Sequence, residues 1–249
     1  MNVLSIGNSF SQDAQRYLYG IARAAGVTLH TFNLYIGGCP LSRHHRNMLS
    51  EEKAYTLEMN GISTGFQMSM KEALLSRDWD YITLQQVSNQ SPKYDTYQPY
   101  LEYLVAYIRK LAPKAKLLIH ETWGYEDGSY RLTEEMKYES YGAMLSDIRD
   151  AYERAAKDSA SEFIIPSGEV LAGLIAEGIK VHRDTFHLSL GIGRYAVGLT
   201  WFKMLTGKDI LDNTFSDFDV PVTEKEINLA KRIATEVCEE YKNKVILPF

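Results

Sequence analysis

Cysteine and long apolar runs are scarce in this chain of 249 residues. The two cysteines, Cys39 and Cys238, lie far apart and form no Cys-x-x-Cys pair. This spacing indicates two reduced thiols, and neither a disulfide framework nor a zinc site. No stretch approaches the ~20 apolar residues that a membrane-spanning helix needs, so no membrane partner is expected.

Basic clusters are missing as well. The chain has 27 Lys and Arg against 32 Asp and Glu, a formal net charge of −5, and no run of basic residues. Because nucleic acids are bound through basic patches, no nucleic-acid partner is expected. The glycines around Gly7 match neither the dinucleotide-binding pattern nor the P-loop pattern, so we expect no nucleotide cofactor either.

The start of the sequence bears on location. The first apolar run begins at Asn2, which leaves no room within this sequence for the charged and apolar segments of a signal peptide. The sequence as given therefore predicts a cytoplasmic protein. A chain from which a signal peptide had been removed would look the same, and would be secreted or periplasmic. The oligomeric state stays open.

Short apolar runs alternate with longer helical patterns along the chain. This order is typical of a parallel sheet with helices on both faces. We expect a single domain over residues 1–249, a three-layer α/β/α, flavodoxin-like fold with a central parallel sheet of about five strands. The expected strands cover residues 2–6, 29–35, 81–85, 116–120 and 162–165. The least regular segment, 37–65, is a long connection at the carboxyl edge of the sheet, where binding residues tend to lie.

Three residue types in this chain can form an acyl-transfer triad. Ser9 directly follows the first apolar run, and Asp184 and His187 are spaced so that one turn can aim both side chains at the same point. We expect Ser9 to be the nucleophile, His187 its base, and Asp184 the group that orients the imidazole. The alternatives are that Ser9 and His187 only cap helices, and that Asp184 pairs with Arg183.

The sequence resembles the SGNH (GDSL-type) hydrolases. Residues 7–11, Gly-Asn-Ser-Phe-Ser, are similar to the Gly-Asp-Ser block of that family, and residues 184–187 to its final Asp-x-x-His block. Gly37-Gly38 is similar to the block that supplies a backbone oxyanion donor. Residues 84–91 differ from the usual Gly-x-Asn-Asp block and, with Trp123, are closer to a divergent, mostly uncharacterised branch. The resemblance implies a serine hydrolase that needs no metal or organic cofactor.

An oxyanion hole requires hydrogen-bond donors beside the nucleophile. We expect the backbone N–H groups of Ser9 and Gly38 to be two of them. A side-chain amide is expected as the third, and the residues after the third strand offer Gln85, Gln86 and Asn89. Asn89 is favoured by residue type and Gln85 by its place at the strand end. The alternative is that these amides only bond neighbouring loops.

Other polar and aromatic residues are candidates for substrate binding: His44, Gln86 and Trp123. Adjacent histidines seldom face the same way, so His44 and His45 indicate a solvated or substrate-contacting role and not a metal site. Trp123 could form the floor of a sugar-binding site or belong to the core. We predict hydrolysis of a small ester, an O-acetyl group on a carbohydrate. The alternatives are a lipase- or thioesterase-like acyl hydrolase and a non-catalytic carbohydrate-binding relative.

Overall fold

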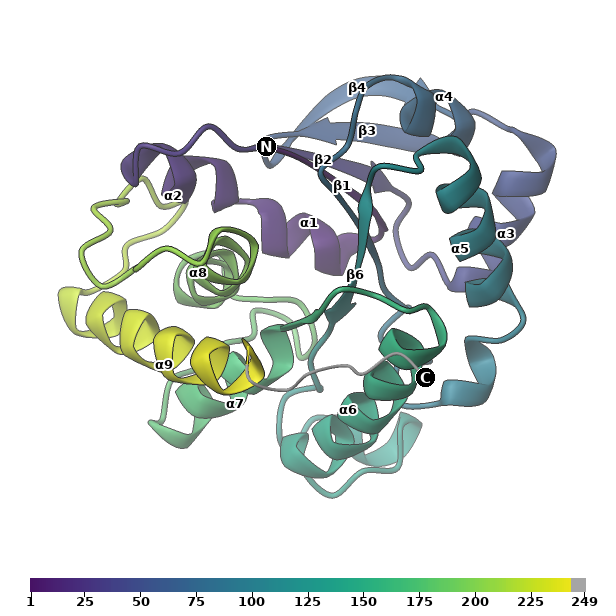
Figure 1. The fold of residues 1–249 in the computed structure, drawn as a ribbon. Helices are drawn as coiled ribbons and strands as arrows, with labels where there is room; N and C mark the ends of the chain where they lie inside the picture. Colours follow the sequence, from purple (N-terminus) through teal and green to yellow (C-terminus); the bar gives the residue numbers. More distant parts are fainter. Residues whose placement is uncertain (243–249) are drawn as a thin grey trace.

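Parallel strands form the centre of the molecule (Figure 1). The computed structural model describes residues 1–242, and within them the sheet has the order β4-β3-β2-β1-β5-β6-β7. Its parallel strands are β1 (Asn2–Gly7), β2 (His30–Tyr35), β5 (Tyr81–Leu84), β6 (Lys116–Glu121) and β7 (Ile164–Pro166). All five lie where the apolar runs predict strands. Residues 243–249, which the predicted single domain includes, lie outside the described part.

A β-hairpin extends the sheet beyond β2, and the apolar pattern did not predict it. Its strands are β3 (Tyr55–Met59) and β4 (Ile62–Met68), which pair antiparallel. Asn60 and Gly61 make the turn with φ of 53° and 78°, as a two-residue hairpin turn requires. Most β4 side chains are exposed, so the strand has no apolar run to reveal it. The α/β fold class is confirmed, with seven strands in the described residues instead of about five.

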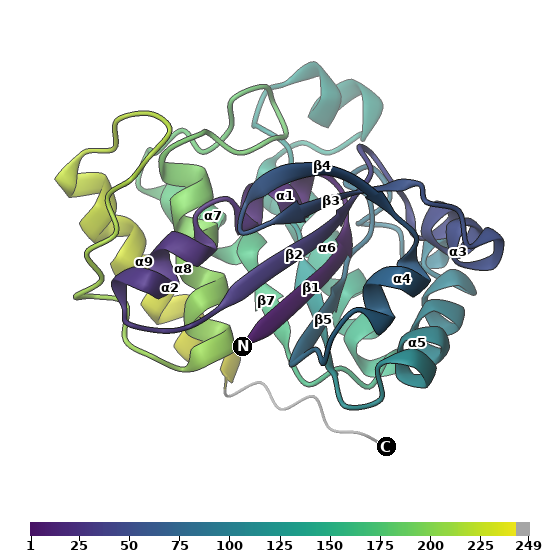
Figure 2. The same cartoon turned by 90° about the horizontal axis from the view of Figure 1, so that it is seen from above.

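Helices cover both faces of the sheet, which gives the predicted three layers (Figures 1 and 2). The helices that follow β1 and β7 lie on one face: α1 (Ser9–Gln15), α2 (Leu18–Ala24), α7 (Ser167–Ala176), α8 (Ile192–Thr206) and α9 (Glu224–Lys242). The helices that follow the other strands lie on the opposite face: α3 (Leu41–Ser50), α4 (Met70–Leu75), α5 (Tyr100–Leu111) and α6 (Tyr141–Asp158).

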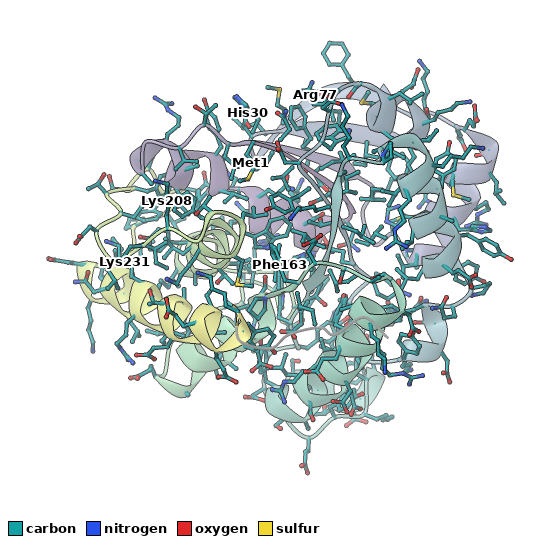
Figure 3. All side chains as sticks on the ribbon, viewed as in Figure 1. Met1, His30, Arg77, Phe163, Lys208 and Lys231 are labelled. Atoms are coloured by element: carbon teal, nitrogen blue, oxygen red, sulfur yellow. The ribbon has the colours of Figure 1, made fainter. Side chains whose placement is uncertain are left out.

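The core lies between the sheet and these two helical layers, where side chains fill the space (Figure 3). Leu4 and Ile6 of β1 and Leu118 of β6 are completely buried, as expected for strands with helices on both faces. α8 is buried along nearly its whole length, whereas α9 shows an apolar face to the core and a charged face to solvent. None of the helices in residues 1–242 is long and apolar enough to cross a membrane.

The strand order creates a crevice at the carboxyl edge of the sheet. The chain leaves β1 toward β2 on one side, and later returns to β5 on the other side of β1. In open α/β sheets, ligands bind at such a switch point, because the connecting loops diverge there. The loops that follow β1, β2 and β5 therefore meet above the same edge.

Candidate active site

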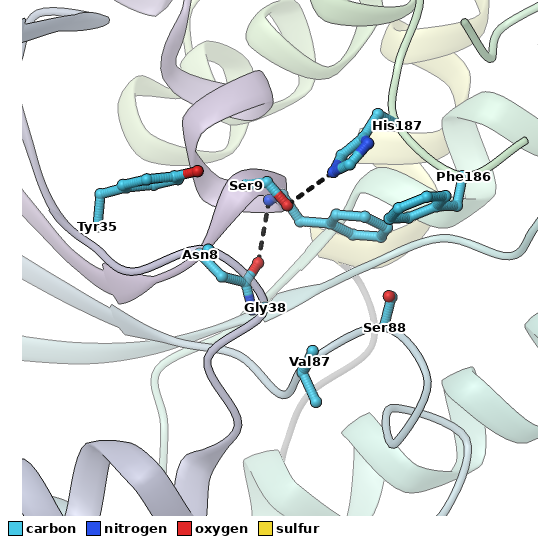
Figure 4. A pocket seen from close by; sticks show the side chains of 10 residues that line it. Asn8, Ser9, Tyr35, Gly38, Val87, Ser88, Phe186 and His187 are labelled. Atoms are coloured by element: carbon cyan, nitrogen blue, oxygen red, sulfur yellow. Dashed lines mark hydrogen bonds between the residues drawn. The ribbon is translucent and has the colours of Figure 1, made fainter. Parts of the chain in front are cut away.

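A pocket of about 230 Å³ lies at this switch point (Figure 4). Its walls come from the loops after β1, β2 and β5 and from the loop before α8. The lining residues are Asn8, Ser9, Phe10, Tyr35, Gly37, Gly38, Val87, Ser88, Phe186 and His187. The pocket thus joins segments from both ends of the chain.

Ser9 is the first residue of α1. The side chain of Asn8 caps this helix by accepting a hydrogen bond from the N–H of Phe10 at 3.0 Å. Ser11 closes the capping box, since its Oγ accepts from the N–H of Asn8 at 3.0 Å. A Cβ at Gly7 would lie 2.2 Å from Ser11 Oγ, so this tight strand-to-helix turn requires glycine. The turn leaves the Ser9 hydroxyl at the pocket wall.

Ser9, His187 and Asp184 form one hydrogen-bonded chain, and Figure 4 shows its link between Ser9 and His187. His187 Nε2 lies 2.9 Å from Ser9 Oγ, and His187 Nδ1 lies 2.9 Å from Asp184 Oδ2. Asp184 Oδ1 also accepts from the backbone N–H of His187 at 2.9 Å, which fixes the turn between the two residues. A carboxylate only accepts, so the proton sits on Nδ1 and Nε2 can take the Ser9 proton. The distances are those of a nucleophile, a base and its orienting acid.

The pKa of Asp184 lies below its usual value. Partial burial raises this pKa, but the hydrogen bonds from the backbone N–H and imidazole of His187 lower it by more, and Arg183 adds a smaller lowering effect. Asp184 is therefore ionised around neutral pH and suited to stabilise an imidazolium. Arg183, the alternative partner considered for Asp184, approaches it only to 3.9 Å.

Two hydrogen bonds to backbone carbonyls hold the loop that carries Asp184 and His187. Thr185 has a φ of 77°, which is unusual for a β-branched residue and requires support from its surroundings. Its carbonyl accepts from the N–H of Glu126 at 2.7 Å, and the next carbonyl, of Phe186, accepts from Trp123 Nε1 at 2.8 Å. Trp123 is fully buried and stacks on Phe10 with ring centroids 4.1 Å apart. Its predicted role at a sugar site is not supported, because it has no surface to offer a ligand.

Asp13 ties the helix of Ser9 to the loop of His187. The side chain of Asp13 is fully buried in α1. It accepts hydrogen bonds from Arg183 Nη1 at 3.0 Å, from Arg194 Nε at 2.8 Å and from the backbone N–H of Leu188 at 3.0 Å. Asp13 lies in none of the motifs named above, although an acidic side chain beside the apolar stripe of the first helix is a recognisable signal.

Asn8 and Gln85 belong to a buried polar network behind the pocket. Gln85 Nε2 donates to Asn8 Oδ1 at 2.9 Å, and Asn8 Nδ2 donates to the carbonyl of Cys39 at 3.2 Å. Burial lowers the pKa of His120 to about 3, so its neutral ring donates from Nδ1 to Gln85 Oε1 at 2.6 Å. Gln85 does not line the pocket and its amide bonds to Asn8 and His120, so the predicted role of Gln85 as an oxyanion donor is not supported. It positions Asn8 instead.

The other two predicted amides also lie away from the pocket. Gln86 is fully buried, and its Oε1 accepts from the backbone N–H groups of Leu41 and Val87, each at 2.9 Å. It anchors the loop after β5 and does not contact the space that a substrate would occupy. Asn89 is exposed in the turn that follows and does not line the pocket. Neither the substrate role predicted for Gln86 nor the oxyanion role predicted for Asn89 is supported by its position.

His44 is a core residue in the described structure. It is fully buried, its Nδ1 lies 3.0 Å from the hydroxyl of Tyr55, and the two rings are parallel. Burial first, and Arg43 second, lower the pKa of His44 to about 3. The predicted substrate contact is not supported. No group of three or more His, Cys, Asp or Glu side chains among residues 1–242 could hold a metal ion.

Backbone donors remain available beside Ser9. The N–H of Ser9 belongs to the first turn of α1, whose N–H groups have no carbonyl partner within the helix. Gly38 lines the pocket with a φ of 60°, a left-handed conformation that glycine adopts without strain. Both predicted backbone donors are thus located at the pocket wall. The apolar contributions of Tyr35, Val87 and Phe186 were not predicted from the sequence.

Comparison with known proteins places the chain in a family. Residues 2–237 match the family described as Domain of unknown function (DUF4886). A DUF4886 family protein from Bacteroides uniformis has a crystal structure with a TM-score of 0.90 and 34% identity, covering 98% of this chain and 96% of that one. No curated protein matches the sequence.

More distant solved structures share the fold. A provisionally assigned SGNH hydrolase from Slackia heliotrinireducens has a TM-score of 0.57 and 20% identity, covering 82% of this chain and 97% of that one. The acetyl xylan esterase AlAXEase has a TM-score of 0.54 and 15% identity, covering 82% and 98%. The expected resemblance to a divergent SGNH-like branch is confirmed at the level of the fold. The chain belongs to the DUF4886 family and has the fold of the SGNH hydrolases.

Proposed function

We propose that this protein is a serine esterase that removes a short acyl group, an O-acetyl group, from a carbohydrate. The observation that carries the proposal is the hydrogen-bonded chain from Ser9 through His187 to Asp184, which opens on a pocket. Two contacts of 2.9 Å match what proton transfer from a serine to an oriented imidazole needs. Ser9 and His187 both line this pocket, so a substrate can reach the hydroxyl and its proposed base together.

In the proposed reaction, Ser9 Oγ attacks the ester carbonyl carbon while His187 Nε2 takes the hydroxyl proton. The carbonyl π electrons move to the oxygen, where the N–H groups of Ser9 and Gly38 stabilise the negative charge. The C–O bond to the alcohol then breaks, and His187 returns the proton to the leaving oxygen. Water repeats the cycle on the acyl-enzyme, with His187 again taking and returning one proton. Asp184 stays ionised and stabilises the imidazolium.

The size of the pocket supports a short acyl group. A cavity of about 230 Å³ holds a small group beside Ser9, and Tyr35, Val87 and Phe186 limit it on the apolar side. Each buried methylene contributes only ~0.8 kcal/mol, so long chains must be excluded by shape and not by weak affinity. The substrate is therefore expected to carry its recognition groups on the alcohol side.

Two features support a carbohydrate as the alcohol. Tyr35 and Phe186 offer aromatic surfaces at the pocket, which can pack against sugar C–H groups in the way first expected of Trp123. One protein with the same fold is an acetyl xylan esterase by name, so the fold is compatible with this chemistry. An acetylated oligosaccharide is the proposed substrate class.

The test combines covalent labelling with a substrate assay. A fluorophosphonate probe should modify Ser9, located by peptide mass, and the protein should release acetate from acetylated xylo- or gluco-oligosaccharides. Labelling of a different serine contradicts the assignment of the nucleophile. A preference for octanoyl esters would favour a lipase- or thioesterase-like enzyme, and saccharide binding without turnover would favour a non-catalytic binding protein.

A further inference from the structure

The loop after β5 brings a hydroxyl group to the pocket. The loops after β1 and β2 contribute the backbone donors of Ser9 and Gly38, and the loop after β5 contributes Val87 and Ser88. The Val87 side chain is apolar. Figure 4 shows the Ser88 hydroxyl directed into the pocket. The loop after β5 thus offers the pocket one side-chain donor, the Ser88 hydroxyl. The side-chain amides of Gln85, Gln86 and Asn89 do not reach the pocket.

Tyr125 orients this hydroxyl from behind. Its Oη lies 2.9 Å from Ser88 Oγ, and Tyr125 is 2% exposed. Burial raises the pKa of Tyr125, and hydrogen bonding to Ser88 only partly offsets this, so the phenol keeps its proton. Either hydroxyl can donate in this pair; with the phenol as the donor, the Ser88 proton is free to point into the pocket and its O–H bond is polarised.

The backbone around Ser88 is fixed before any substrate binds. The N–H groups of Gln90 and Ser91 both donate to the carbonyl of Val87 at 2.9 Å, and Ser91 Oγ donates to the carbonyl of Ser88 at 2.9 Å. Gln86 Oε1 holds the N–H of Val87 from the other side at 2.9 Å. A donor in such a closed turn needs no reorganisation during reaction, which is the condition for strong electrostatic stabilisation.

We propose that Ser88 is a catalytic residue, the third oxyanion donor, and that Tyr125 is its positioning residue. This inference rests on the proposed esterase function. When Ser9 Oγ bonds to the carbonyl carbon, the Ser88 hydroxyl donates a hydrogen bond to the carbonyl oxygen beside the N–H groups of Ser9 and Gly38. Ser88 keeps its proton throughout, because His187 carries out all proton transfers.

The test compares hydroxyl-bearing and hydroxyl-free side chains at position 88. Ser88→Ala should lower kcat for p-nitrophenyl acetate about 10²-fold with little change in KM, as loss of one oxyanion donor does. Ser88→Thr and Ser88→Val have the same shape and differ in the hydroxyl, so the threonine variant should be clearly the faster of the two. Tyr125→Phe should lower kcat less than Ser88→Ala. Asn89→Ala is the matched control in the same turn and should match the wild type.

The outcomes separate this inference from the function it rests on. If Ser88→Ala and Ser88→Val turn over at the wild-type rate, or if Asn89→Ala loses as much activity, the role of Ser88 is overturned while the esterase stands. If the wild type neither hydrolyses esters nor reacts with a fluorophosphonate at Ser9, the esterase function fails and the role of Ser88 falls with it. Thermal unfolding of every variant identifies losses that come from misfolding.

Discussion

Asp13 accepts a hydrogen bond from the backbone N–H of Leu188 at 3.0 Å, which joins two segments that are far apart in the chain. Asp13 lies one helical turn beyond Ser9, and Leu188 directly follows His187. The two arginines that neutralise Asp13, Arg183 and Arg194, flank the same loop. The segments that carry Ser9 and His187, the proposed nucleophile and base, are thus held together by the buried carboxylate of Asp13.

Replacing Asp13 with asparagine should affect stability and activity together. The variant leaves Arg183 and Arg194 without their buried partner, and breaking a buried ion pair costs about 3 to 5 kcal/mol. We expect a loss of this size in the free energy of unfolding, measured in urea. In the esterase assay, kcat should fall by a larger factor than KM rises. Asp219→Asn is the matched control, because Asp219 also pairs with Arg194 but is partly exposed, and it should cost about 1 kcal/mol or less. Equal effects of the two variants would contradict the role of Asp13.

Removal of the proposed nucleophile or the proposed base should abolish turnover without unfolding the protein. Ser9→Ala should lower kcat/KM for p-nitrophenyl acetate by at least ~10³-fold, and His187→Ala should cost about as much. The double variant should be no slower than either single one, because the two residues act as a unit. Steady-state kinetics and melting temperatures measure both effects. Additive losses would show that the two residues act separately.

Asp184 links stability to pH. Its pKa is lower in the folded chain than the usual ~3.9, so the ionised carboxylate contributes stability that is fully present above that value. The contribution is lost as the pH falls through the folded pKa. The unfolding free energies of the wild type and Asp184→Asn should differ by a constant amount above about pH 5, and the difference should shrink below about pH 4. Urea titrations across this range test the sign, and a difference that grows in acid would contradict it.

The proposed acyl pocket predicts that the rate of ester hydrolysis depends steeply on the length of the acyl chain. Rates with p-nitrophenyl esters should fall from acetyl to butyryl to octanoyl, because Val87 and Phe186 close the pocket. Val87→Ala should raise the butyryl rate relative to the acetyl rate by enlarging this wall. Leu49→Ala, at an exposed position outside the pocket, should leave the ratio unchanged. An octanoyl preference in the wild type would exclude the short-chain pocket.

Local patterns predicted the fold class and the residues that the structure brings together at the triad. The apolar runs mark the parallel strands, and Asp184 and His187 are close enough in sequence for one turn to join them. The hairpin had a local signal too, Asn60-Gly61, but its exposed second strand has no apolar pattern.

The remaining site residues depend on packing between distant segments. After β5, only the burial of Gln86 against Leu41 and the turn that follows decide that Ser88, and not Asn89, faces the pocket. Trp123 has the composition of a sugar-binding residue, yet the helix of Ser9 covers its ring through Phe10. Side chains of one type can be core or ligand contacts, and the sequence around them does not distinguish the two.

The hydrogen bonds of the Asn8 side chain bear on how this divergent SGNH-like branch differs from other SGNH hydrolases. Its Oδ1 accepts from Phe10 and Gln85 while its Nδ2 donates to the carbonyl of Cys39, next to Gly38. The Gly-Asp-Ser block of the SGNH hydrolases has an aspartate at this place, and an ionised aspartate has no proton to donate and would face the Cys39 carbonyl with a second acceptor. Exchange between the two residues therefore requires a compensating change in the loop after β2, so the two segments are expected to have evolved as a pair.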